Sequence, residues 1–247
     1  MNKRIIPFIV MGGVVVIGLG VMVGFIVANA NRKPAVKEID KVQGTWEIYN
    51  YDTDPANWDK PLVRVQNQFM VFEDDHMTYY VNGNVAYTAD VKLDENFLTQ
   101  TPTGTSKAGT LPEKLRYRRY SDYNIELLDE VGSNGKPRRW DFIKHSGTYN
   151  QYATYADSDI NGVWDVNMRS HVADTRQLTV NAAEKKISIL NKETNQMQEI
   201  TYAWKEGEVN TFTAQGMGDV HVYKPTADVL FFVQQKDCTV WELRSTK

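Results

Sequence analysis

Apolar and polar residues alternate over short stretches through most of this chain, and the stretches fall into two series. The first series predicts strands at residues 44–51, 66–72, 75–81, 84–92, 96–100, 114–120, 123–130 and 137–145. The second series predicts strands at residues 162–168, 176–181, 185–191, 197–205, 209–215, 219–224, 228–235 and 238–245. Each stretch is rich in β-branched or aromatic residues and ends at polar residues, glycine or proline. No stretch has sustained helical periodicity, so the pattern predicts two antiparallel meanders.

The two series begin and end with matching sequences. Each opens with Gly-x-Trp and closes with a strand that contains a tryptophan. The residues of this signature are Gly44, Trp46 and Trp140 in the first series and Gly162, Trp164 and Trp241 in the second. Such a repeat predicts tandem modules of similar fold. Closing each meander into a barrel would remove its exposed edges.

Alternation also predicts which side chains point inward. Trp46 and Ile48 share one face, and this apolar stripe ends at the polar Asn50. In the second module, Trp164, Val166 and Met168 share one face, so the apolar stripe there is one residue longer.

Gly-x-Trp at the start of an eight-strand meander resembles the lipocalin-like (calycin) β-barrel family. Before the seventh strand, the first module has Ser121, Asp122 and Tyr123, similar to the family's Thr-Asp-Tyr motif, and Thr226-Ala227-Asp228 is a weaker match in the second. The resemblance implies up-and-down eight-stranded barrels with an open mouth for a hydrophobic or amphipathic ligand. It also implies a basic residue that stacks on the first-strand tryptophan. The candidates are Arg138, Arg139 and Lys144 in the first module and Arg244 in the second. Both modules are shorter than a full lipocalin, and no helix is predicted after the last strand of either.

Three connections are longer in the first module than in the second. They are residues 52–61, 101–112 and 131–137, and all three follow odd-numbered strands. In an up-and-down meander such connections emerge at one rim, and long loops on a rigid scaffold often carry function. We therefore expect a ligand at this rim, with Trp58 as an apolar lid residue; the alternative is that the loops are tolerated surface insertions.

Three further residues are candidates for ligand binding in the first module. Arg119 shares a strand face with Tyr117, and Arg138 shares one with Trp140. Either arginine would meet an anionic group, while the aromatic ring beside it would contact apolar atoms.

An apolar stretch without charged side chains precedes the modules, from Ile5 to Ala28. Its length of roughly 24 residues is enough to span a bilayer as a signal-anchor helix. The alternative is a signal peptide that is cleaved after Ala30. Gly20 and Gly24 form a small-xxx-small pair that favours helix self-association. We expect a single-pass protein of a bacterial cell membrane with its C-terminal domains outside the cytoplasm.

These patterns divide the chain into six segments. They are a basic tail (1–4), a transmembrane helix (5–28), a linker (29–42), barrel 1 (43–148), a second linker (149–159) and barrel 2 (160–247). The predicted fold class is all-β, with two tandem antiparallel eight-stranded barrels and one transmembrane helix.

Composition narrows the function classes. The net charge of −3 gives no reason to expect nucleic-acid binding. The single Cys238 excludes a disulfide within the chain. No metal-ligand spacing or catalytic motif is present, so no cofactor, metal or enzymatic activity is expected. The prediction is a membrane-anchored binding protein for a hydrophobic or amphipathic ligand, held mainly by barrel 1. The alternative is a structural or interaction subunit of a cell-envelope assembly, with solid-cored barrels that meet a protein partner.

Overall fold

The structure, a computed structural model, describes residues 37–52, 67–104, 111–132, 135, 137–149, 153–237 and 239–246. Trp58, Cys238, Gly20, Gly24 and the apolar stretch at 5–28 lie outside the described residues. Among the helices of the described part, none is long and apolar enough to cross a membrane. Residues Lys37–Lys247 form one compact unit.

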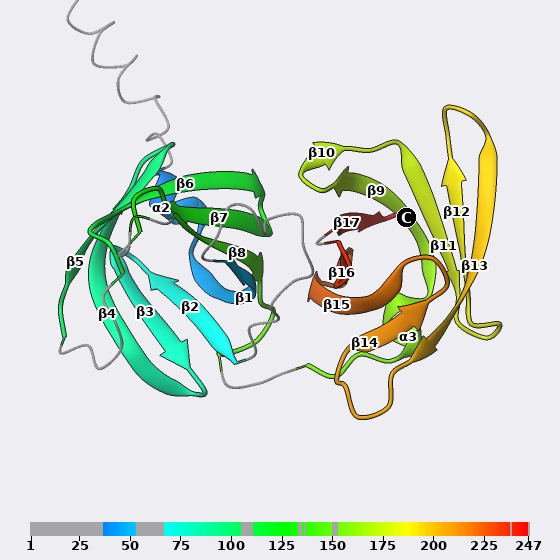
Figure 1. The fold of residues 1–247 in the computed structure, drawn as a ribbon, viewed down its shortest axis with the longest axis horizontal. Helices are drawn as coiled ribbons and strands as arrows, with labels where there is room; N and C mark the ends of the chain where they lie inside the picture. The colour runs from blue at the N-terminus through cyan, green and yellow to red at the C-terminus, as the bar shows by residue number, and fades with distance from the viewer. Residues whose placement is uncertain are drawn as a thin grey trace, which may run out of the picture. The chain divides into compact units, whose positions relative to one another are not determined.

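Barrel 1 is a closed, antiparallel, eight-stranded barrel in which each strand pairs with the next and β8 pairs with β1 (Figure 1). Its strands are β1 (Gly44–Asp52), β2 (Gln68–Glu73), β3 (His76–Val81), β4 (Asn84–Leu93), β5 (Phe97–Pro102), β6 (Lys114–Ser121), β7 (Asn124–Asp129) and β8 (Arg138–Lys144). All eight strands lie where the alternation predicts them, within two residues at each end.

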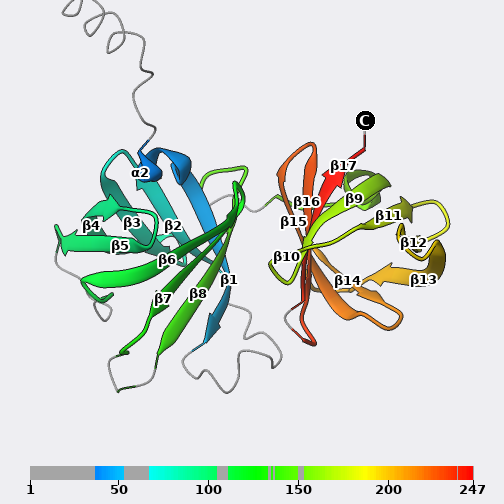
Figure 2. The same cartoon turned by 90° about the horizontal axis from the view of Figure 1, so that it is seen from above.

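Barrel 2 repeats this architecture, because β9 pairs with both β11 and β17 and so closes the sheet (Figure 2). Its strands are β9 (Gly162–Arg169), β11 (Arg176–Asn181), β12 (Lys186–Asn191), β13 (Gln196–Trp204), β14 (Thr211–Ala214), β15 (Gly218–Thr226), β16 (Val229–Gln234) and β17 (Val240–Ser245). A further two-residue strand, β10 (Val172–Ala173), pairs only with β9. The predicted all-β fold with two closed antiparallel barrels is thus confirmed.

Inward-facing side chains from alternating positions fill each barrel. In barrel 1, Trp46, Phe72 and Phe142 are among the largest fully buried side chains. In barrel 2, Phe212 packs edge-on against Phe232, with ring centroids 5.1 Å apart. Apolar burial of this kind is the main driving force for each fold.

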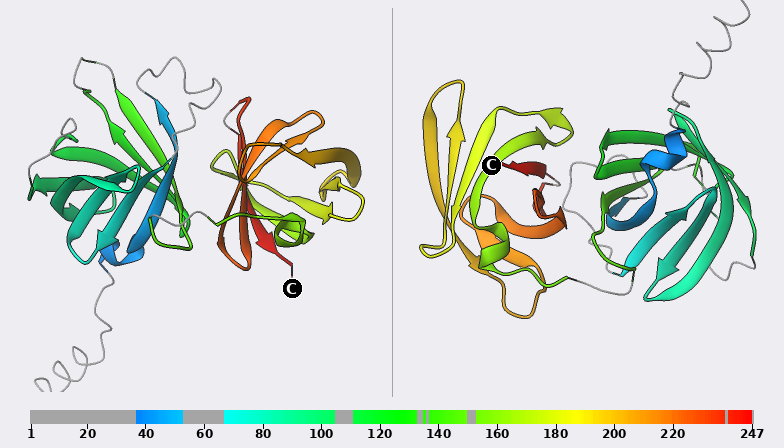
Figure 3. Two further views of the ribbon diagram at one scale, coloured as in Figure 1. Left: turned by 90° about the horizontal axis from the view of Figure 1, so that it is seen from below. Right: turned by 180° about the vertical axis from the view of Figure 1, so that it is seen from behind.

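A short helix closes one end of each barrel, which the sequence pattern did not predict. Helix α2 (Glu38–Lys41) precedes β1, and helix α3 (Asp157–Ile160) precedes β9 (Figure 3). The indole N–H of Trp46 donates to the Val42 carbonyl at 2.6 Å, and that of Trp164 donates to the Ile160 carbonyl at 2.9 Å. Each Gly-x-Trp tryptophan therefore fixes the chain segment that enters its own barrel. Both helices lie wholly or mostly within stretches assigned to linkers.

A β-bulge at the same place in both barrels corrects the predicted faces. In β1 the pairing with β8 shifts between Ile48 and Asn50, so Tyr51 pairs with Trp140 on the inner face. The Asn50 amide instead donates to Asp141 on the outer face, at 2.7 Å. A bulge inserts one unpaired residue and so reverses the alternation beyond it. The prediction that the inner stripe reaches Asn50 was wrong for this reason.

The second bulge has the same consequence in β9. Pairing with β17 shifts so that Met168 lies opposite Glu242 and Arg169 lies opposite Trp241. Met168 therefore leaves the inner face on which alternation had placed it, and Arg169 joins that face. Tyr51 and Arg169 are structurally equivalent, because each pairs with the tryptophan of its barrel's last strand.

A third apolar cluster contains residues from both barrels on their outer faces. Its members are Tyr49, Tyr123, Ile143, Tyr223, Val229, Phe231, Val233 and Val240. The Tyr49 and Tyr223 rings lie 6.3 Å apart. Apolar side chains that point away from each barrel's own core are buried here, so the barrels share an apolar contact.

Polar groups beside this cluster are also buried. Asp141 accepts hydrogen bonds from Asn50 and from Arg139 Nε, the latter at 2.9 Å. Burial raises the pKa of Asp141 to about 6, an effect that Glu126 adds to and Arg139 opposes. The ring of His171 stacks on that of Tyr120, with centroids 3.6 Å apart. Burial, with Arg139 and Arg118 nearby, lowers the pKa of His171 to about 4.

Candidate functional site: the mouth of barrel 1

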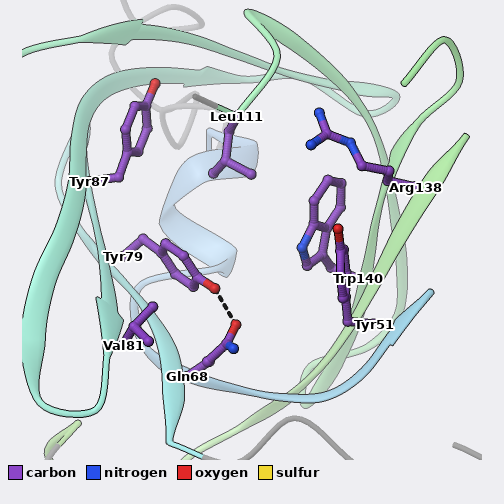
Figure 4. A pocket seen from close by; sticks show the side chains of 8 residues that line it. All are labelled: Tyr51, Gln68, Tyr79, Val81, Tyr87, Leu111, Arg138 and Trp140. Carbon is purple, nitrogen blue, oxygen red and sulfur yellow. Dashed lines mark hydrogen bonds between the residues drawn. The ribbon is translucent and has the colours of Figure 1, made fainter. Parts of the chain in front are cut away.

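A cavity of about 250 Å³ opens at one end of barrel 1. Figure 4 shows aromatic rings on two opposite walls, with Tyr51 and Trp140 facing Tyr79 and Tyr87. The complete lining is Tyr51, Gln68, Tyr79, Val81, Tyr87, Leu111, Arg138 and Trp140. The site is therefore mainly apolar, with a few polar groups that converge on it, as is usual for small-molecule pockets.

The strand ends place this cavity at the rim that the long connections predict. Tyr51 and Val81 lie at the ends of β1 and β3, while Gln68 and Arg138 begin β2 and β8. Leu111 belongs to the connection between β5 and β6. Helix α2 is seen behind the cavity in Figure 4, at the far end of the barrel. We call this rim the mouth of barrel 1.

Two tyrosines supply hydroxyl groups to the site. The Tyr79 hydroxyl donates a hydrogen bond to Gln68 Oε1. Burial, with Tyr51 nearby, raises the pKa of Tyr79 to about 12, so this hydroxyl remains protonated. The buried Tyr87 hydroxyl has no hydrogen-bond partner within the described residues. An unpaired buried hydroxyl is costly, and a ligand acceptor would remove that cost.

Arg138 contributes a cation whose charge is balanced within the protein. Its Nε and Nη2 donate to Asp129 Oδ2 at 3.0 and 2.8 Å. Asp129 Oδ1 also accepts the backbone N–H groups of Val131 and Gly132, which fixes the carboxylate at the end of β7. The guanidinium carbon lies 5.4 Å from the Trp140 ring. Because Arg138 is paired, the mouth is suited to a neutral or weakly polar head group.

The other predicted ligand residues lie elsewhere. Tyr117 is buried in the core of barrel 1 and is not among the cavity's lining residues. Arg119 lies near the β6–β7 turn, at the opposite end of the barrel, where it pairs with Asp122. Of the four candidates, the structure thus brings only Arg138 to the cavity, and Trp58 lies outside the described residues.

The signature residues occupy structural positions. The Lys144 ammonium lies 5.5 Å from the Trp46 ring centroid, so Lys144 is the basic residue over the first-strand tryptophan of barrel 1. Arg244 instead lies over Tyr123, at 4.8 Å. Asp122 and Tyr123 form the turn before β7, the place that the family resemblance implies.

Most of the cavity was missed from sequence. The lining residues that were not singled out are Tyr51, Gln68, Tyr79, Val81, Tyr87 and Leu111. For Tyr51 the reason is physical, because β1 contains a register shift that changes which residues face inward. The available signal was position, since several lining residues lie at strand ends beside the long connections.

The described residues hold no group of three or more His, Cys, Asp or Glu side chains that would bind a metal ion. The fold and the site define a tandem β-barrel protein with an aromatic pocket at one mouth, and each barrel is consistent with a lipocalin-like barrel. No protein-family model matches the chain, and no curated protein sequence matches it.

Proposed function

We propose that this protein binds a small hydrophobic or amphipathic molecule at the mouth of barrel 1. The observation that carries the proposal is the cavity of about 250 Å³ with its four aromatic side chains. Lipocalin-like barrels admit ligands at the corresponding end, so membership of the calycin group would fit this role.

The cavity limits the size of the ligand. An apolar cavity of about 150 Å³ is sufficient for benzene. The mouth of barrel 1 therefore suits a substituted aromatic ring or a short acyl chain rather than a long lipid. The Tyr87 hydroxyl offers a hydrogen bond to the ligand's polar group.

We further propose that the ligand is bound outside the cytoplasm of a bacterial cell, by a protein that residues 5–28 anchor in the membrane. The support is the uncharged apolar stretch from Ile5 to Ala28. Mass spectrometry of the mature protein tests this part, because loss of the first 30 residues would mean a cleaved signal peptide.

Titration of the full chain with two neutral probes, 4-methylphenol and 1-octanol, followed by calorimetry, tests the ligand role. The informative variant is Val81→Phe, which adds an aromatic ring to the cavity wall. We expect binding of at least one probe to the wild-type chain and a loss of about tenfold or more in Val81→Phe, because the added ring occupies ligand volume.

Val85→Phe is the matched control. Val85 lies on the neighbouring strand, is 59 % exposed and does not line the cavity. Its replacement should leave the affinity unchanged. Equal losses in both variants, or no binding of either probe to the wild-type chain, would contradict the proposed ligand role.

A second candidate function is a structural or interaction role in a cell-envelope assembly. The tightly filled interiors of both barrels favour it, because large apolar side chains occupy most inward positions. In that case, native mass spectrometry of the full chain from its own cells would show a protein partner and no co-purifying small molecule.

A further inference from the structure

The mouth of barrel 2 has a cavity of its own, with different chemistry. Its volume is about 430 Å³. It is lined by Arg176, Ile189, Asn191, Gln196, Met197 and Gln198. These residues belong to the start of β11, the end of β12 and the start of β13, so the cavity lies at the rim that corresponds to the mouth of barrel 1.

Strand register makes the two cavities comparable residue by residue. In barrel 1, Trp46 pairs with Met70 on the next strand, and Met70 pairs with Tyr79. In barrel 2, Trp164 pairs with Leu178, and Leu178 pairs with Ile189. Tyr79 and Ile189 are therefore equivalent. The same steps give further equivalent pairs. These pairs are Gln68 and Arg176, Val81 and Asn191, and Tyr87 and Gln198.

At several equivalent positions barrel 1 has an apolar or aromatic side chain and barrel 2 has a polar one. Where barrel 1 has Val81 and Tyr87, barrel 2 has the amides Asn191 and Gln198. Where barrel 1 has Gln68, barrel 2 has the cation Arg176. Amide side chains both donate and accept hydrogen bonds, so they suit a ligand that carries hydroxyl groups.

Two arginines of barrel 2 lie beside one indole ring, and one of them, Arg176, also lines the cavity. The guanidinium carbons of Arg169 and Arg176 are 5.0 and 5.4 Å from the centroid of the Trp241 ring. Arg169 Nε is shielded from solvent and has no hydrogen-bond partner in the part of the chain that the structure describes. A donor in this condition is stabilised by an anionic acceptor.

Of the two arginines, Arg176 is paired with an acidic group near this mouth. Asp174 lies 3.4 Å from Arg176 Nε and accepts the Arg176 backbone N–H at 2.9 Å. Glu193, on the β12–β13 turn, accepts a hydrogen bond from the Thr175 hydroxyl. Arg169 has no ion pair with any described residue, so its charge is the one available to a ligand.

We propose that the mouth of barrel 2 is a second binding site, which takes a small organic anion that carries hydroxyl groups. Arg169 and Arg176 hold the anionic group beside Trp241, while Asn191, Gln196 and Gln198 hydrogen-bond the hydroxyl groups. The protein then has two sites of complementary chemistry, one aromatic and one polar. This inference does not depend on the ligand role of barrel 1.

The test uses the full chain and three probes, which are glucuronate, glucose and sulfate. Glucuronate has both a carboxylate and hydroxyl groups, glucose has only the hydroxyl groups, and sulfate has only the charge. In calorimetric titrations we expect glucuronate to bind more tightly than either of the others. Arg169→Gln and Arg176→Gln should each weaken glucuronate about tenfold or more, because each removes a charge-assisted hydrogen bond.

Arg116→Gln is the matched control, because Arg116 lies on the outer face of barrel 1 and pairs with Glu130 at 2.9 Å. Circular dichroism of each variant establishes that it is folded. Equal affinity for glucuronate in Arg169→Gln, Arg176→Gln and wild type would overturn the proposal, as would no binding of glucuronate. Tighter binding of sulfate than of glucuronate would leave a simple anion site and overturn the hydroxyl part. Binding of 4-methylphenol in these variants separately reports on barrel 1.

Discussion

The two mouths of this protein have the same framework and different linings. Each is built from the ends of equivalent strands. In each, the first strand has a bulge, and a residue after this bulge pairs with the tryptophan of the last strand. Barrel 1 lines its cavity with Tyr51, Tyr79 and Tyr87. At the equivalent register positions barrel 2 has Arg169, Ile189 and Gln198, of which Ile189 and Gln198 line its cavity. The difference shows that backbone register fixes where a ligand site lies, and side chains decide what it accepts.

The closed ends differ much less than the mouths. In both barrels a four-residue helix contributes a buried isoleucine, Ile39 or Ile160, and the first-strand tryptophan bonds to the chain just before its strand. The closed end therefore serves stability, and variation between the copies is concentrated at the open end.

The largest expected effect comes from breaking what the barrels share. Trp46→Ala and Trp164→Ala should each reduce the free energy of unfolding by about 3–5 kcal/mol, because each removes a large buried side chain. Chemical denaturation measures the loss. Trp46→Phe and Trp164→Phe should lose less, since they keep most of the apolar volume. A loss below about 1 kcal/mol for either alanine variant would contradict the shared stabilising role.

The next effect concerns acid stability and a connection that distinguishes the two barrels. In barrel 2 the connection after the first strand is the tight β9–β10 turn. The ring of His171 in this turn stacks on the ring of Tyr120 of barrel 1. The pKa of His171 falls from 6.5 to about 4 in the folded state. Between these pH values the unfolded chain binds a proton that the folded protein does not, so acidification lowers stability by up to roughly 3 kcal/mol.

Asp141 has the opposite effect on stability at acidic pH. Its pKa rises from 3.8 to about 6 on folding, so the folded protein gains a proton, and relative stability, as the pH falls through this range. We expect His171→Phe to become more stable relative to wild type as the pH is lowered from 6.5 to 4. Denaturant titrations across this pH range measure the difference. His76→Phe is the control, because His76 is the first residue of β3 and its side chain is exposed. An equal pH response in both variants would contradict the role of His171.

A smaller effect is expected from converting one mouth toward the other. The double variant Tyr79→Ile and Tyr87→Gln gives barrel 1 the side chains that barrel 2 has at these positions. Binding of 4-methylphenol should weaken about tenfold or more, because two aromatic contacts are lost. Calorimetry measures the change, and binding of glucuronate to barrel 2 in the same variant is the internal control. Unchanged 4-methylphenol affinity would show that these side chains do not determine what the mouth accepts.

The smallest effect is expected at the opposite end of barrel 1. Arg119→Ala removes an exposed ion pair with Asp122, which contributes at most about 1 kcal/mol. The affinity for 4-methylphenol should change less than about twofold, since Arg119 lies away from the mouth. A large loss of affinity, measured by the same titration, would move the ligand site away from the residues that line the cavity.

The strands were predictable because their alternation and turn residues are local signals. Residues 176–181 form β11 as predicted, and 84–92 falls within β4. The helices were not predictable, because the four residues of α2 are too few to show a 3.6-residue period. Arg138 lies at the predicted rim. The inward position of Tyr51 was not predictable, because it depends on the bulge in β1 and no turn residue marks that bulge in the sequence.

The paired bulge has a consequence for how such a chain can change over time. Beyond it, only the last residues of β1 and β9 face the mouth, while the residues before it belong to the interior. Substitutions at these few terminal positions alter ligand chemistry without disturbing the packed centre. A duplicated copy can therefore acquire a new specificity while the parts that govern folding stay under constraint.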